Sequence, residues 1–88
     1  MNAGDRDAID RDGPVPVWRQ VAAILRARIA SGQIPAGRVL PSEKQIEQEL
    51  EISRGTARKA IALLRDEGLV VTVPGRGTYA ADPPEPDG

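Results

Sequence analysis

Three arginines lie on one face of a predicted helix near the middle of the chain. At 100° per residue, Arg54, Arg58 and Arg65 fall within about 40° of one another. A guanidinium group carries a fixed charge and a planar fork of donors, so it can bind two acceptors of a phosphate or a guanine edge together. Ser53 and Thr56 add short hydroxyl side chains at the start of this helix. The residue types suit recognition of a polyanion, and a solvated helix face with surface ion pairs is the plainer alternative.

The composition argues against catalysis and metal binding. The 88 residues contain no His and no Cys, and aromatic residues are only 2% of the chain. Without imidazole or thiolate groups we expect no metal site, no cofactor and no enzymatic activity. No apolar run approaches the roughly 20 residues of a membrane span, and the N-terminal residues do not resemble a signal peptide. We therefore expect a cytoplasmic protein without a membrane partner.

The net charge of −1 averages over unlike segments. Residues 14–80 contain ten Lys and Arg residues and six acids, whereas residues 1–13 and 81–88 together contain seven acids and two Arg. The two ends also hold little to bury and several Asp, Gly and Pro residues. The sequence therefore predicts one folded, mildly basic domain over residues 14–80, between disordered acidic tails at 1–13 and 81–88.

The first predicted helix follows Pro16 and ends before Gly32. Apolar side chains recur along it at helical spacing and predict its buried face; they are Trp18, Val21, Leu25 and Ile29. Between them stand Arg19, Arg26 and Arg28, which we expect to be solvated. The loop after this helix is expected to be anchored in the core by Ile34 and Leu40.

Two further helices are predicted over residues 42–67. Ser42 with Gln45 forms a capping box at the start of the first, and Ser53 is a good N-cap for the second. The apolar face of the second is formed by Ala57, Ala60, Ile61 and Leu64. A turn of about three residues joins the two helices, which is typical of a helix-turn-helix. In that motif the second helix enters the DNA major groove.

A small β-hairpin is predicted at the end of the domain. Residues 69–73 are apolar or β-branched, "PGRG" is typical of a tight turn, and "TYA" can return as a second strand. Three helices and this hairpin make a mainly α fold, the winged helix-turn-helix. Arg76 is expected at the tip of the wing, where a narrow minor groove attracts Arg. Arg65 is expected to lie past the groove or to pair with Asp66 or Glu67.

Four separated segments, "LPSE", "SRGTAR", "EGLV" and "GRGTY", carry a resemblance to a known family. In order and spacing, over about residues 15–80, the chain resembles the N-terminal DNA-binding domain of the GntR family of bacterial transcription regulators, and its wording is closest to the HutC-like branch. The resemblance implies sequence-specific binding of double-stranded DNA at a palindromic operator, a homodimer on DNA, and usually repression. The DNA contacts that it implies are Lys44, Ser53, Arg54, Gly55, Thr56, Arg58, Gly75, Arg76 and Thr78.

Three residues depart from the family pattern. Lys44 stands where Arg is common, and Lys can neutralise a phosphate but cannot form the bidentate fork. Glu47 stands where a small residue is usual, and Glu51 where Gly is frequent. A non-Gly residue in a left-handed turn costs about 1–2 kcal/mol. We therefore expect a reshaped turn, and unfavourable negative charge near DNA from Glu47 and Glu51.

Family members carry a ligand-sensing and dimerising domain after the wing, whereas about eight residues follow it here. We expect either an excised domain or a regulator without its own sensor, and no small-molecule effector site in this chain. Winged helices can also use the same helix to bind protein. A protein-interaction module without DNA binding is therefore the alternative function.

Overall fold

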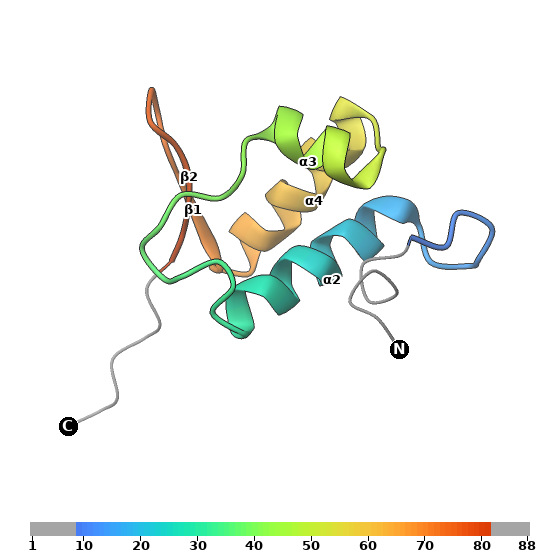
Figure 1. The fold of residues 1–88 in the computed structure, drawn as a ribbon, viewed down its shortest axis with the longest axis horizontal. Coiled ribbons are helices and arrows are strands. Elements are labelled where there is room, and N and C mark those ends of the chain that lie inside the picture. The colour runs from blue at the N-terminus through green and yellow to red at the C-terminus, as the bar shows by residue number, and fades with distance from the viewer. Residues whose placement is uncertain (1–8, 82–88) are drawn as a thin grey trace.

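The computed structural model describes residues 9–81 and has the predicted winged helix-turn-helix fold. Within those residues it contains three α-helices and one antiparallel hairpin (Figure 1). The helices are α2 (Val17–Ala30), α3 (Glu43–Leu50) and α4 (Arg54–Asp66), and the strands are β1 (Val70–Val73) and β2 (Gly77–Ala80). Figure 1 shows α2 and α4 side by side, α3 across one end of them, and the hairpin projecting past the helices. Hereafter the wing means residues 70–80.

An aliphatic core joins all of these elements. The largest fully buried side chains are Leu25, Ile46, Leu64, Val21 and Val70. The predicted apolar face of α4 is buried as a whole, because its side chains stand at i, i+3, i+4 and i+7 against α2 and α3. Ile34 and Leu40 are buried too and anchor the loop between α2 and α3, as the sequence predicts.

Trp18 does not join this core, contrary to the prediction. Its ring is half-buried, and two cations lie against it. The Lys59 Nζ is 4.6 Å from the ring centroid and the Arg19 Cζ is 5.2 Å from it, distances typical of cation–π contacts. Trp18 therefore links the start of α2 to α4 through its cation–π contact with Lys59.

Two arginines that were expected to be solvated form ion pairs between helices. The Arg28 guanidinium is buried, with 7% of the residue exposed, and donates to both carboxylate oxygens of Glu49 on α3. The Arg26 guanidinium donates to Glu67 at 2.9 and 2.7 Å, just past the end of α4. This hydrogen bond raises the pKa of Arg26. The arginines of α2 thus fasten it to the ends of the two other helices.

The turn between α3 and α4 keeps the shape that a glycine would give it. The capping box of Ser42 and Gln45 starts α3, and Glu51 ends it with φ 55° and ψ 54°, in the left-handed region. The expectation of a reshaped turn is therefore wrong. The Arg11 NH2 group donates to the carbonyl oxygens of Leu50 (3.1 Å) and Glu51 (2.8 Å), which are among the unpaired acceptors at a helix end.

Residues 9–13, which the sequence places in a disordered tail, make contacts in the structure. Besides the two bonds from Arg11, the Asp10 backbone N–H donates to the Gln20 Oε1 (2.8 Å), and the Gln20 Nε2 donates back to the Asp10 carbonyl (2.7 Å). Ile9 packs half-buried against the core. The remaining segments of the proposed tails, 1–8 and 82–88, lie outside the described residues.

The wing is tied to the helices at several points. Antiparallel pairing places Val70 opposite Ala80, and both side chains are buried. Arg65, expected to lie past the groove or to pair with Asp66 or Glu67, donates through Nε and NH2 to the Thr72 Oγ1 at 3.2 and 2.8 Å. The predicted pairing with an acid is therefore wrong, because β1 lies beside α4 and brings Thr72 within reach; its position past the groove stays a prediction. Arg65 therefore holds the wing against α4.

Candidate nucleic-acid interface

A cleft of about 640 Å³ lies between the start of α3, the outer side of α4 and the wing. Five of the nine predicted contact residues line it; they are Lys44, Arg54, Arg58, Arg76 and Thr78. Each comes from an element that its local sequence fixes: the capped start of α3, the first two turns of α4, and the hairpin after its Pro-Gly turn. The fold therefore gathers in one depression residues that are up to 34 positions apart in the chain.

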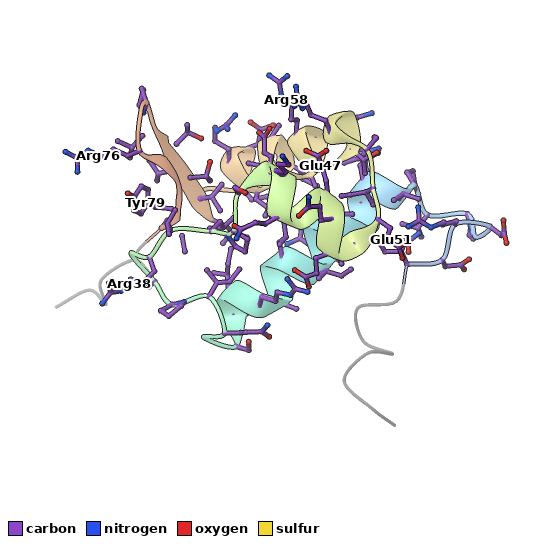
Figure 2. The ribbon with its side chains drawn as sticks, turned by 45° about the horizontal axis from the view of Figure 1, so that its top comes forward. Arg38, Glu47, Glu51, Arg58, Arg76 and Tyr79 are labelled. Atoms are coloured by element: carbon purple, nitrogen blue, oxygen red, sulfur yellow. The ribbon has the colours of Figure 1, made fainter. Side chains whose placement is uncertain are left out.

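The four cations of this cleft point their charge at solvent. Lys44, Arg54, Arg58 and Arg76 are all exposed, and none of them forms an ion pair with another described residue. Figure 2 shows Arg58 at one side of the molecule and Arg76 extending outward from the wing. The other arginines of the helices are engaged elsewhere, so these four side chains are a surface available to an external anion.

The start of α4 adds a second kind of donor outside the cleft. Ser53 caps the helix: its Oγ accepts from the Thr56 backbone N–H (3.1 Å) and donates to the Thr56 Oγ1 (2.9 Å). The single hydroxyl proton of Ser53 is thus used internally, whereas the proton of the Thr56 hydroxyl is left to an outside acceptor. Exposed backbone N–H groups at this helix end add positive potential. Of the two hydroxyl groups, that of Thr56 is therefore the better placed to donate to an outside acceptor.

Gly55 stands at this helix end where a side chain would meet nothing of the protein. A Cβ built on it has no neighbour within 4 Å, so internal packing does not require glycine there. Glycine inside a helix costs about 0.5–1 kcal/mol relative to alanine. The bare backbone leaves room for the close approach of another molecule.

The tip of the wing has a backbone that needs glycine. Gly75 follows Pro74 with φ 77°, the pattern of a type II turn, and the Arg76 N–H donates to the Val73 carbonyl at 2.9 Å. Gly75 does not line the cleft, unlike Arg76 next to it in the chain. The turn places Arg76 at the end of the hairpin.

Two acidic residues also line the cleft, Glu43 and Glu47. From the sequence we expected Glu47 near the ligand, but not within the same depression as the arginines. The i, i+3 spacing between Lys44 and Glu47, which puts both on one face of the helix, is the sequence pattern that could have indicated this.

Among residues 9–81, no group of three or more acidic residues could hold a metal ion. No helix in that range is long and apolar enough to cross a membrane.

The sequence of this domain matches a described family over most of its length. Residues 18–80 match the family described as "Bacterial regulatory proteins, gntR family". The chain belongs to the GntR family. Among curated GntR relatives, the transcriptional repressor NagR of Bacillus subtilis is 35% identical over 75 residues, which cover 85% of this chain and 31% of NagR. The histidine utilization repressor of Pseudomonas putida is 35% identical over 72 residues, covering 82% of this chain and 29% of that protein. The chain thus spans less than a third of the length of these relatives.

Solved structures of similar domains share the fold. The DNA-binding domain of AraR in complex with operator ORX1 has a TM-score of 0.75 and 32% identity, covering 84% of this chain and 98% of that domain. YtrA from Sulfolobus acidocaldarius, a GntR-family transcription factor, has a TM-score of 0.74 and 29% identity, covering 90% of this chain and 66% of YtrA. The helices and wing described above are therefore the winged helix-turn-helix of GntR proteins.

Proposed function

We propose that this domain binds double-stranded operator DNA in a sequence-specific manner and regulates transcription as a repressor. In this proposal α4 enters the major groove and the wing lies in the minor groove. The observation that carries it is the cleft, in which α3, α4 and the wing together present four exposed cations without internal partners. The likeness to the AraR domain solved on its operator supports the same conclusion.

The proposed roles follow from reach and chemistry. Arg54 and Arg58 are the long forked donors of α4 and recognise guanine O6 and N7. Lys44 neutralises a phosphate from the start of α3, and Thr56 donates to another. Arg76 enters the minor groove from the wing tip. The remaining predicted contacts shape the start of α4 and the wing, and offer backbone or hydroxyl groups to phosphate. They are Ser53, Gly55, Gly75 and Thr78.

The assembly and setting belong to the same proposal. We propose that the domain binds a palindromic operator as a homodimer, belongs to the HutC-like branch and is located in the cytoplasm at the nucleoid. The repressors among its relatives support this proposal. We propose no catalytic activity and no small-molecule effector site within this chain. Its surface chemistry is that of a binding module, since four exposed cations from α3, α4 and the wing converge on one cleft.

Selection of bound sequences from a random DNA pool tests the proposal, followed by anisotropy titration of the enriched site at several salt concentrations. We expect affinity to fall steeply with salt, because each neutralised phosphate releases counterions. Arg54→Ala should weaken binding by about 1–3 kcal/mol and relax the preference at one base position. Arg38→Ala is the matched control: it removes the same charge from an exposed loop residue that does not line the cleft.

Two results would contradict the proposal. Enrichment of no sequence, with equal and salt-insensitive binding of wild type and Arg54→Ala, would exclude specific recognition by α4. Failure to retain random DNA even at low salt would favour the alternative, a winged helix that binds protein.

A further inference from the structure

Glu47 is a carboxylate set among the cations of the cleft. It stands three residues after Lys44 on the same face of α3, and both side chains line the cleft with Arg54 and Arg58 of α4. Figure 2 shows Glu47 and Arg58 toward the same side of the molecule. Glu47 is half-buried, so a ligand can reach its side chain only from the open side of the cleft.

The Glu47 carboxylate has no partner among the described residues. Within residues 9–81 its side chain accepts no hydrogen bond and forms no ion pair, although its neighbour Glu49 is paired with Arg28. The backbone carbonyl of Glu47 accepts from the Glu51 and Ile52 N–H groups, which holds the residue in the last turns of α3. Glu47 is therefore fixed at the backbone, while its carboxylate is open to a ligand in the cleft.

A DNA duplex in this cleft offers a carboxylate few favourable partners. Phosphates repel it, and the major-groove edges of guanine and thymine present acceptors only, apart from the thymine methyl group. The donors are the amino groups at cytosine N4 and adenine N6. Adenine N7 is an acceptor beside N6 and opposes a carboxylate placed there. Cytosine carries no acceptor next to N4, so it is the base that a carboxylate favours.

We propose that Glu47 is a specificity-determining residue that accepts a hydrogen bond from the N4 amino group of one cytosine in each bound half-site. This inference rests on the proposed function and goes further by assigning a base to a residue of α3. Arg54 and Arg58 favour guanine at the same edge of the groove. The cleft therefore recognises G·C pairs from both sides, and Glu47 also acts against sequences that place an acceptor opposite it.

The test compares wild type, Glu47→Gln and Glu47→Ala by selection from a random DNA pool, with anisotropy titrations of single-base variants of the enriched site. We expect wild type to prefer cytosine at one position by about 5-fold to 30-fold, the lower range for a single side chain–base pair. Glu47→Gln should move that preference to adenine, whose N6 and N7 a carboxamide binds together. Glu47→Ala should lose the preference. Glu51→Gln, which removes an equal charge one helical turn away and outside the cleft, should keep it.

Each other outcome counts against the inference. Uniformly tighter binding of the Glu47 variants with unchanged base preference would show that Glu47 only repels phosphate. A change confined to the positions that Arg54→Ala or Arg58→Ala also relaxes would show that Glu47 orients an arginine and touches no base. Wild type that binds no DNA overturns the proposed function itself, whereas specific wild-type binding with either result above overturns this inference alone.

Discussion

Exchanging Glu49 for Gln removes the charge opposite a buried guanidinium and changes little else. The Glu49 carboxylate accepts both hydrogen bonds from Arg28, one of them with a length of 3.1 Å between NH1 and Oε1. A carboxamide retains a single oxygen acceptor, and its N–H groups face the N–H groups of the guanidinium. The variant therefore keeps the shape of the contact and loses its charge complementarity.

The expected loss follows from the burial of the two partners. Breaking a fully buried ion pair costs about 3–5 kcal/mol, and a hydrogen bond to a charged group contributes about 1.5–3 kcal/mol. The Arg28 side chain is 8% exposed but that of Glu49 is 47% exposed, so water reaches one side of the pair. We therefore expect a loss of about 2 kcal/mol in the free energy of unfolding, the lower part of this range. For a domain of this size that lowers Tm by about 8–16 °C.

Urea denaturation followed by circular dichroism, with Tm from thermal melts, measures this loss. Glu47→Gln is the control, because it is the same substitution on the same helix at a carboxylate without an ion pair among the described residues. It should change the free energy of unfolding by less than about 0.5 kcal/mol. Arg28→Met combined with Glu49→Gln should recover part of the loss, since it removes the buried charge as well.

Equal unfolding free energies for Glu49→Gln and Glu47→Gln would refute this reasoning. So would a double variant as unstable as the sum of its two single variants, because two partners in contact must show a coupling energy.

Two further substitutions test the turn between α3 and α4 by the same urea denaturation. Glu51→Gly should raise the free energy of unfolding by about 1 kcal/mol, because glycine adopts a φ of 55° without steric cost. Glu51→Ala retains the Cβ and should give no such gain. Equal effects of the two substitutions would count against strain at this residue. Arg11→Ala should lower the free energy of unfolding by about 1 kcal/mol through loss of two hydrogen bonds to the end of α3, and an unchanged midpoint, as expected for the control Arg38→Ala, would show that those bonds do not stabilise the domain in solution.

Local patterns were sufficient to predict the elements of this fold. The apolar face of α4 follows from residues within three turns of one another, and the capping box at Ser42 lies within four residues. The left-handed conformations of Gly32 and Gly75 also follow from neighbouring residues. Predictions of this kind depend on the backbone close by, which the sequence contains directly.

Contacts between elements were harder to predict, because they depend on how helices pack. Arg28 and Glu49 are 21 residues apart, and Arg26 and Glu67 are 41 apart. An arginine between apolar positions of an amphipathic helix looks the same in sequence whether solvent or a second helix covers it. The candidate site was predictable in its residue types. Its division into a cleft and a separate helix start, with Glu47 inside the cleft, required the spatial arrangement of α3, α4 and the wing.

The placement of Trp18 gives this domain a built-in spectroscopic reporter. It is the chain's only tryptophan, and the ammonium group of Lys59, on a different helix, rests 4.6 Å from its ring. Indole fluorescence responds to a nearby cation, so its emission follows any event that draws Lys59 off the ring or separates α2 from α4. Unfolding and ligand encounter at α4 can therefore be followed on the unlabelled protein at micromolar concentrations or below.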